Sequence, residues 1–441
     1  PRSFLLFCFV LLCLQQTCSG IRPFRAQGSK QKQQDVESII RENYLLPRDR
    51  GRDDDGESLD WIQELTKNEL RKRAGGRKVN EYCWVPEGRD SCAPQFIIAG
   101  SMKCGTTSLH TYLLNHPQVL PLVEGAQLAG KEVLAMKEIR FFNDPTFKRL
   151  YQKKGLKESL NDYYNLFRDM PIPQEEDNST LPMISGDATP MYVCQDFTAK
   201  RAYLGLPEAK VIIMARNPAD RMFSEFWFKQ SLRSSNRIFN SGPKESDQSF
   251  FLKCIRPEMK RMEYCGAHKL AENLSVKGVE EFNDCVKQTA ISAQQSNCKE
   301  AVYEGMCSEI QASQYCSPKT VLNSFYAAQI ILWKELYGDN LLVVNSDEFY
   351  ADTPRMMVQV AKFLGLTEFD WEAVTQDAFN IVNALPKDDV RLVSTNQGGL
   401  FVGGMSTEKT SSYPPMNPEI RAEIEEFFRP LNKATADLVH N

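Results

Sequence analysis

Residues 96–116 read FIIAGSMKCGTTSLHTYLLNH, and this stretch decides the fold. Its first four residues, 96–99, form an apolar run long enough for a buried strand. Gly100 and Gly105 bracket a short turn, and apolar residues recur at helical spacing from Leu109 onward. A strand, a turn and a helix N-terminus in this order predict an anion-binding cradle, because unpaired amides and the positive end of the helix dipole point at the turn.

The residues within this turn indicate which anion it binds. In nucleoside triphosphate hydrolases the pattern is G-x-x-x-x-G-K-[ST], and its lysine reaches the β- and γ-phosphates. Gly100 and Gly105 keep that spacing, and Thr107 occupies the hydroxyl position. However, Thr106 stands at the lysine position, and the lysine lies inside the turn as Lys103. A lysine there lies beside the first anionic group, which argues against ATP hydrolysis and favours a shorter phosphoanhydride.

A second element predicts another anion site. Residues 210–215, KVIIMA, have the composition of a buried strand, which leads into R-N-P-x-x-R-x-x-S. Arg216 ends that strand, and Pro218 begins a helix that carries Ser224. Because parallel strands present their carboxyl ends at one edge of a sheet, we expect Arg216 and Ser224 beside the first turn. The planar fork of an arginine suits a terminal phosphate.

The order of the elements predicts the fold class. A third apolar run, 341–344, is followed by a helix that opens at Thr353 and stops at Gly365. Strands therefore alternate with helices along the chain. This pattern predicts an α/β fold with a P-loop-like parallel sheet flanked by helices in a single domain.

The two anion elements resemble the cofactor site of sulfotransferases. Residues 103–109, K-x-G-T-T-x-L, are similar to the 5′-phosphosulfate loop, and residues 207–224 are similar to the 3′-phosphate region. The resemblance implies the donor 3′-phosphoadenosine 5′-phosphosulfate (PAPS), with adenosine 3′,5′-bisphosphate as the product. The implied cofactor-binding residues are Lys103, Cys104, Gly105, Thr106, Thr107, Ser108, Arg216, Ser224 and, in a cofactor lid at 403–413, Lys409.

Residues 93–435 as a whole resemble the Golgi-lumen carbohydrate sulfotransferases of the heparan sulfate and chondroitin sulfate kind. Residues 137–142, KEIRFF, are similar to an element whose glutamate is the catalytic base. The resemblance implies this role for Glu138, with Lys103 stabilising charge on the leaving group. Residues 187–192, DATPMY, are similar to the substrate-side T-P-x-Y element. The implied substrate-binding residues are Arg140, Thr189 and Tyr192.

The chain departs from this family pattern mainly on the acceptor side. Arg140 stands where many members have histidine or another polar residue, and Ala188 where some have lysine. The lid keeps Lys409 but has serines where basic residues are common. No cysteine follows Cys316, so the lid disulfide of the heparan enzymes is absent. The resemblance therefore implies the cofactor but not the identity of the acceptor.

The start of the chain indicates export into the secretory pathway. Residues 4–14 form an uninterrupted apolar run, which suits a signal-peptide core better than a full membrane span. A short signal anchor of a type II membrane protein is the alternative. We expect a leader at 1–20, a flexible charge-dense stem at 21–80 and a catalytic domain at 81–441 in the Golgi lumen.

The cysteines and two sequons agree with an oxidising compartment. Of 13 cysteines, six crowd residues 254–316, an even set that predicts a loop-rich insert held by disulfides. Zinc is disfavoured, because His268 is the one histidine nearby and no ligand pair has compact spacing. The six are Cys254, Cys265, Cys285, Cys298, Cys307 and Cys316. N-glycosylation sequons begin at Asn178 and Asn273.

Composition and charge limit the partners. The net charge of −4 does not favour a nucleic-acid partner. The resemblance implies a carbohydrate acceptor, most naturally a polysaccharide. No metal is required, because Lys103 and backbone amides meet the charge of the leaving group. His110 and His116 are rival bases, but both fall on the helix behind the turn and are predicted to pack there. Two alternatives remain: a sulfotransferase for protein tyrosine or a small hydroxylated metabolite, and a catalytically inactive nucleotide-binding homologue.

Overall fold

A parallel sheet lies at the centre of the fold in the computed structural model of the chain. The structure describes residues 61–123, 127–128, 131–132, 137–143, 146–172, 182–235, 248–295, 319–375, 392–393, 400–401 and 414–440. Four strands lie in the order β10-β9-β4-β8, and each neighbouring pair is parallel. They are β4 (Phe96–Gly100), β8 (Gly186–Asp187), β9 (Lys210–Ala215) and β10 (Leu341–Asn345). The predicted α/β class is confirmed, and β8 is a strand that the sequence did not indicate.

Burial on both faces explains these strands. β4 is buried at all of its positions, and β9 is buried at its four central positions. Ile97 of β4 is paired with Val211 of β9, which is paired in turn with Leu341 of β10. Parallel strands covered on both faces appear in a sequence as continuous apolar runs, which is why composition alone located three of them.

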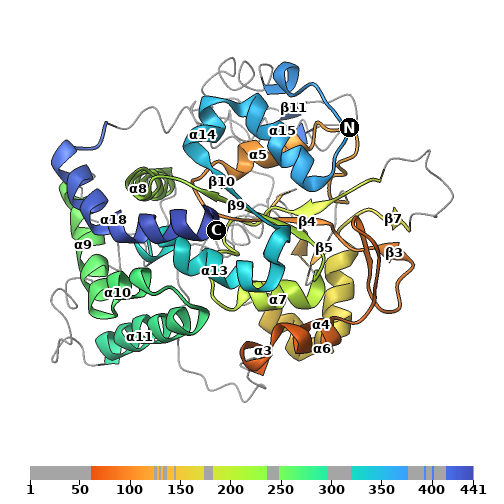
Figure 1. Cartoon of the computed structure of the whole chain (residues 1–441), viewed down its shortest axis with the longest axis horizontal. Helices are drawn as coiled ribbons and strands as arrows, with labels where there is room; N and C mark the ends of the chain where they lie inside the picture. Colours follow the sequence, from red (N-terminus) through yellow and green to blue (C-terminus); the bar gives the residue numbers. More distant parts are fainter. Residues whose placement is uncertain are drawn as a thin grey trace, which may run out of the picture. The chain divides into compact units, whose positions relative to one another are not determined.

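Helices cover both faces of the sheet. Figure 1 shows α5 (Thr106–Leu113) and α15 (Thr353–Leu364) on one face and α7 (Thr198–Gly205) and α13 (Tyr326–Tyr337) on the other. The ends of α15 are those that the sequence predicted. Asp352 caps its first turn with a side-chain hydrogen bond, and Gly365 ends it with φ of 75°.

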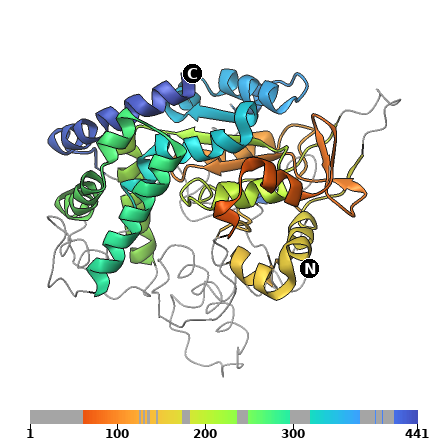
Figure 2. The same cartoon turned by 60° about the horizontal axis from the view of Figure 1, so that its bottom comes forward.

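A second group of helices forms a core of its own. The group consists of α8 (Pro218–Ser235), α9 (Gln248–Tyr264), α10 (Ala267–Glu272), α11 (Val276–Gln295) and α18 (Pro418–His440), and Figure 2 shows the green α9 to α11 beside the blue α18. Phe251, Val279 and Phe428 are among its buried side chains. Residues 254–295 are therefore mostly helical, and the loop-rich insert expected from the sequence is wrong for them. Pro257 inside α9 and the turn at Gly266 interrupt the apolar periodicity that would have indicated these helices.

Disulfides hold the cysteine-rich region, as predicted. Cys265 is bonded to Cys285 and thereby joins the end of α9 to α11. Cys254 is also disulfide-bonded. Cys298, Cys307 and Cys316 lie outside the described residues. A further disulfide joins Cys83 to Cys92 just before the first strand of the sheet.

The folded body begins earlier than the sequence suggested. Residues 61–80 were expected in the flexible stem, but they form α3 (Trp61–Glu64), α4 (Lys67–Ala74) and β1 (Arg77–Asn80). Ile62 and Leu70 are fully buried. Glu208 forms ion pairs with Arg71 and with Lys78. Ile62 and Leu70, together with these ion pairs, hold the segment against the rest of the fold. Two buried residues among many charged ones form no apolar pattern, so the sequence did not predict this structure.

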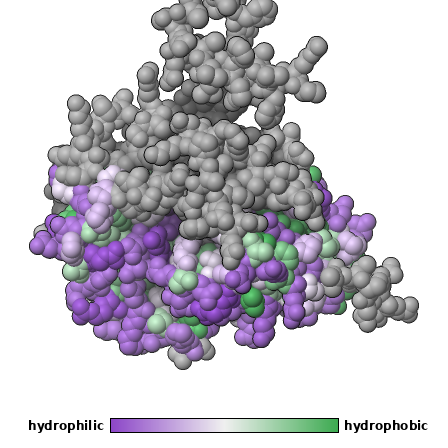
Figure 3. Space-filling view, turned by 90° about the horizontal axis from the view of Figure 1, so that it is seen from above, coloured by the Kyte–Doolittle hydropathy of each residue, from purple (hydrophilic) through white to green (hydrophobic). Residues whose placement is uncertain are grey.

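Further helices and strands complete the described part of the chain. They are α6 (Thr146–Tyr164), α14 (Ser346–Ala351), η1 (Leu322–Ser324), η2 (Gly338–Asn340), β2 (Cys83–Val85), β3 (Ser91–Cys92), β5 (Gln127–Leu128), β6 (Lys131–Glu132), β7 (Met170–Pro171), β11 (Leu392–Val393) and β12 (Leu400–Phe401). Where Figure 3 shows described residues, most of them are hydrophilic, with small hydrophobic patches between them. Within the described ranges, no helix is long and apolar enough to span a bilayer. The leader, residues 21–60, the Asn178 sequon and Lys409 lie outside those ranges.

Candidate active site

Three loops meet at the carboxyl edge of the sheet. The turn 101–105 follows β4, Arg216 follows β9, and Asn345 ends β10 where α14 begins. These three strands are adjacent and parallel, so the loops that follow them lie at the same edge. The fold therefore brings the two sequence-predicted anion elements together.

The turn before α5 has the backbone of an anion cradle. Gly105 precedes the helix with φ of 95°, a left-handed conformation that other residues rarely adopt. A Cβ at Gly105 would lie 2.7 Å from the hydroxyl oxygen of Tyr350. The Ser346 hydroxyl donates a 2.6 Å hydrogen bond to the carbonyl of Cys104, whose side chain is fully buried. Helix α14 thus supports the turn, and Cys104 presents its backbone, not its thiol, to the site.

The first turn of α5 contacts the segment that carries Glu138. Lys137 Nζ donates to Thr107 Oγ1 at 2.8 Å and to Thr106 Oγ1 at 3.3 Å. Thr106 is buried and Thr107 is exposed. Ser108 Oγ lies 3.5 Å from the hydroxyl of Tyr350. The structure therefore joins the predicted phosphosulfate loop to the predicted base through a lysine that the sequence did not single out.

Lys103 and Arg216 are close enough to influence each other. Nζ of Lys103 lies 4.4 Å from the ring centroid of Phe228 on α8. Burial lowers the pKa of the Lys103 ammonium; Glu225 opposes that change, and the Arg216 guanidinium adds to it. The site therefore holds two neighbouring cations, the arrangement that attracts an anion.

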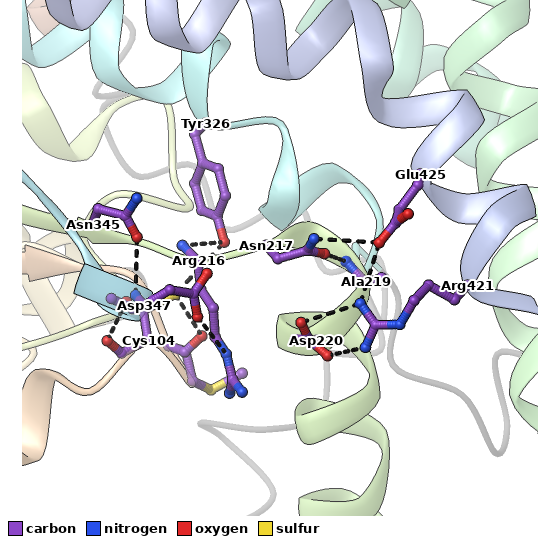
Figure 4. A network of polar contacts seen from close by, with 12 residues as sticks. Cys104, Arg216, Asn217, Ala219, Asp220, Tyr326, Asn345, Asp347, Arg421 and Glu425 are labelled. Carbon is purple, nitrogen blue, oxygen red and sulfur yellow. Dashed lines mark hydrogen bonds and ion pairs between the residues drawn. The ribbon is translucent and has the colours of Figure 1, made fainter. Parts of the chain in front are cut away.

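Arg216 is held at the edge of the sheet by groups from three elements. Its Nε lies 4.0 Å from Asp347 Oδ1, and its amide donates to the hydroxyl of Tyr326 at 3.4 Å. Figure 4 shows Asp347, Tyr326 and Cys104 around it. In the described part of the chain, the buried Nε has no hydrogen-bond partner. A guanidinium with an unused donor fits a phosphate ligand.

Side chains of α18 hold the start of helix α8. Arg421 of α18 is paired with Asp220 and with Glu425, and Asn217 donates to Glu425 at 3.4 Å (Figure 4). Ser224 follows on α8 and is 2% exposed. Its contact with a 3′-phosphate stays a prediction.

Glu138 lies in an ion-pair cluster. Arg140 Nη2 is 2.6 Å from Glu138 Oε2, and Lys137 Nζ is 3.8 Å from Glu138 Oε1. The Glu138 side chain is 24% exposed, so a substrate hydroxyl has access to it. Phe141 and Phe142 are fully buried, with ring centroids 4.9 Å apart, and anchor the segment. Arg140, predicted to bind the substrate, is thus also the direct partner of Glu138.

Thr189 and Tyr192, for which contact with the substrate stays a prediction, lie in a buried hydrogen-bond network. Both are fully buried, and both hydroxyls donate to Asp187, at 2.6 Å in each case. Thr189 Oγ1 also accepts a 3.1 Å hydrogen bond from the amide of Arg140. This geometry makes Thr189 and Tyr192 supports of the Glu138 segment and leaves direct contact with an acceptor without structural support.

The contacts of two residues in this site were missed by the sequence interpretation. Lys137 was interpreted within the KEIRFF element as a charge acting on Glu138, but its contact with the phosphosulfate loop was not foreseen. Asp187 was quoted within DATPMY but was given no role. An acid followed closely by two hydroxyl residues could have indicated a hydrogen-bonded support. Burial raises the pKa of Asp187 to about 6, against hydrogen bonds that act to lower it.

The histidines pack as predicted. His110 is buried, and burial lowers its pKa to about 3, so the imidazole is neutral. His116 is buried as well, with Nε2 3.2 Å from the carbonyl of Thr367. His268 contacts the carbonyl of Phe427 at 2.9 Å on the helical group. None of these contacts involves the loops at the carboxyl edge.

Comparison with known proteins identifies the segment that carries this site. Residues 94–242 match the family model described as Sulfotransferase family. They form a sulfotransferase-family domain. This span includes the turn before α5, Glu138, Asp187 and Arg216. The family-level resemblance stated from the sequence is therefore confirmed for this segment.

Sulfotransferases are also found among relatives over longer stretches. The chain is 28% identical over 225 residues to the membrane-associated sulfotransferase kil1 of Dictyostelium discoideum, covering 51% of this chain and 38% of that protein. It is 23% identical over 373 residues to the bifunctional heparan sulfate N-deacetylase/N-sulfotransferase 2 of Homo sapiens, covering 82% and 31%. It is 26% identical over 191 residues to carbohydrate sulfotransferase 15 of Rattus norvegicus, covering 36% and 31%. The chain thus spans less than two fifths of the length of these curated relatives.

A solved structure of a sulfotransferase from Alicyclobacillus acidocaldarius is also similar. It has a TM-score of 0.37 and 21% identity, covering 79% of this chain and 96% of that one.

Proposed function

We propose that this protein transfers a sulfuryl group from PAPS to a hydroxyl of a carbohydrate in the lumen of the secretory pathway. The observation that carries this proposal is Lys103 in the turn before α5, next to Arg216 at the end of the neighbouring strand. A cation on each of two adjacent loops suits an adenosine nucleotide with an anion at its 5′ and its 3′ position. The match of residues 94–242 to the sulfotransferase family supports the same donor class.

The chain offers a matching set of groups for this donor. When bound, the donor supplies an activated sulfuryl group. Lys103 and the first-turn amides of α5 meet negative charge at its 5′ end, and charge that grows there is stabilised by groups already in place. Arg216, at the end of β9, meets the 3′-phosphate with the exposed part of its guanidinium.

Glu138 supplies the base on the acceptor side. Its carboxylate accepts the proton of the acceptor hydroxyl, a role that needs access and a fixed orientation. Partial exposure provides the access, and the bond from Arg140 provides the orientation. Asp187 supports this segment through Thr189, whose hydroxyl donates to Asp187 and accepts the amide of Arg140.

Three features support a carbohydrate acceptor and the secretory compartment. The relatives include proteins named for heparan sulfate and for carbohydrate sulfation. The disulfides Cys83–Cys92 and Cys265–Cys285 are typical of oxidising compartments. Asn273, the first residue of a sequon, is exposed in the turn between α10 and α11, where an attached glycan has room.

Calorimetry with two nucleotides tests the donor. The full chain should bind adenosine 3′,5′-bisphosphate well and ATP poorly. Arg216→Ala should weaken the bisphosphate by about 2–3 kcal/mol, roughly 30- to 150-fold, with a much smaller effect on adenosine 5′-phosphate. Arg355→Ala, which removes an exposed arginine paired with Asp352, is the control. ATP binding equal to or tighter than bisphosphate binding would contradict the proposal.

Transfer from labelled PAPS tests the acceptor. The panel contains heparan sulfate, chondroitin, a tyrosine peptide and a small phenol. We expect label on a polysaccharide. Label on the peptide or the phenol alone would contradict the carbohydrate acceptor, and nucleotide binding without transfer to any acceptor would indicate an inactive homologue.

A further inference from the structure

Lys137 is a largely buried cation for which the chemistry above leaves no role. Its side chain is 15% exposed. Nζ donates to the hydroxyls of Thr107 at 2.8 Å and Thr106 at 3.3 Å, both on the first turn of α5. The carboxylate nearest to it is Glu138, at 3.8 Å, and Arg140 already binds that carboxylate at 2.6 Å. Lys137 therefore shares one negative charge with a closer arginine.

The other groups around Lys137 do not neutralise it. From α5 it faces the two threonine hydroxyls and His110, which is neutral because burial lowers its pKa to about 3. From the turn, Lys103 acts on it as a like charge. Its own segment supplies Glu138 and Arg140. Among the described residues, Lys137 thus shares the charge of Glu138 with Arg140 and also experiences the positive charge of Lys103, so an anion bound at the start of α5 would stabilise it.

We infer that Lys137 binds the anionic 5′ end of the donor nucleotide as a second lysine of the cradle, alongside Lys103. The inference rests on the proposed function, because it assumes an adenosine nucleotide in the cradle. The contact with Thr107 places the ammonium against the same helix turn whose amides face an anion. The contact with Glu138 joins donor binding to the segment that carries the base.

The charge state of Lys137 gives the inference a pH signature. Burial lowers its pKa to about 8, with Glu138 opposing this and Arg140 and Lys103 adding to it. A bound anion favours the charged form, so nucleotide binding raises the pKa and takes up a proton at alkaline pH. The affinity of the unaltered protein should therefore fall as pH rises through about 8.

The test is calorimetry of the full chain with two nucleotides that differ at the 5′ position. Adenosine 3′,5′-bisphosphate carries the 5′ anion and adenosine 3′-phosphate lacks it. Lys137→Met should weaken the bisphosphate about 10- to 100-fold near pH 7 and leave adenosine 3′-phosphate within about twofold, which also reports an intact fold. Lys137→Arg should restore most of the affinity. Lys154→Met, which removes a lysine paired with Asp162 on α6, is the matched control and should change neither.

The outcomes separate this inference from the proposed function. Between about pH 7 and 9 the unaltered protein should lose bisphosphate affinity more steeply than Lys137→Met does. Equal affinity of the unaltered protein and Lys137→Met, or equal pH slopes, would overturn the inference alone. No binding of the bisphosphate by the unaltered protein would overturn the proposed function and the inference with it.

Discussion

The carboxylate of Asp187 accepts a 2.6 Å hydrogen bond from the hydroxyl of Thr189, and both side chains are fully buried. Tyr192 donates to the same carboxylate at 2.6 Å and Tyr163 at 3.3 Å. Thr189 in turn accepts the amide of Arg140. The fully buried Asp187, at the end of β8, thus orients the segment that carries the proposed base Glu138.

The first prediction concerns the pH dependence of stability. Burial raises the pKa of Asp187 from 3.8 to about 6, so the folded state holds its proton more tightly than the unfolded state. The corresponding stabilisation is fully present below about pH 4 and is lost as pH rises through about 6. Relative to Asp187→Asn, the free energy of unfolding of the unaltered protein should therefore fall by on the order of 2–3 kcal/mol across this range.

Urea unfolding at a series of pH values measures this difference. Thr189→Val keeps the carboxyl group but removes a hydrogen bond that lowers its pKa, so this variant should keep the fall in stability and extend it to higher pH. Parallel pH profiles for the unaltered protein and Asp187→Asn would show that Asp187 does not titrate in this way.

The second prediction concerns the proposed base. Glu138→Gln keeps the shape of the side chain but removes its basicity, so turnover should fall by about 10²–10⁴-fold. Binding of adenosine 3′,5′-bisphosphate should stay nearly unchanged, because the cradle cations remain. Lys103→Ala should lower both turnover and binding, which separates the two roles. Near-normal turnover of Glu138→Gln with its acceptor would place the base elsewhere.

The third prediction concerns the backbone of the cradle. Gly105→Ala should destabilise the protein by about 1–3 kcal/mol and weaken nucleotide binding, because φ is 95° and the new Cβ would meet the Tyr350 hydroxyl. Thermal unfolding and calorimetry measure the two effects. Gly266→Ala is the matched control: Gly266 precedes α10 in the same left-handed conformation, with φ of 81°, and no atom lies within 4 Å of the added Cβ. It should show the backbone cost alone and bind nucleotide normally. Equal effects of both variants would mean that the contact with Tyr350 is unimportant.

The fourth prediction concerns the disulfide of the helical group. Cys265 and Cys285 are 20 residues apart, so replacing both with alanine should cost about 3 kcal/mol of stability. Denaturant unfolding measures this loss. Thiol labelling of the denatured, non-reduced protein should modify Cys104 and Cys194, which are free, and should spare Cys265 and Cys285. Label on the paired cysteines of active protein would contradict the pairing.

The sequence alone determined three of the four strands of the parallel sheet and the ends of α15. The runs 96–99, 210–215 and 341–344 are apolar because both faces of a parallel sheet are covered, and this is a local property of each run. Asp352 and Gly365 likewise act within one helical turn. The cradle followed from the same local logic, since a strand, a glycine turn and a helix N-terminus are consecutive in the chain.

Only the tertiary structure decided which of these parts meet. The strand order β10-β9-β4-β8 places Arg216 beside the turn before α5, and no local pattern encodes that order. Lys137 became part of the cradle through a contact with Thr107, thirty residues away. The hydroxyl groups of Thr189 and Tyr192 point to Asp187, because a buried carboxyl group without hydrogen-bond partners would be costly. Burial and charge pairing between distant segments depend on the whole fold. Local residue spacing therefore indicated the kind of site but not which distant side chain each residue contacts.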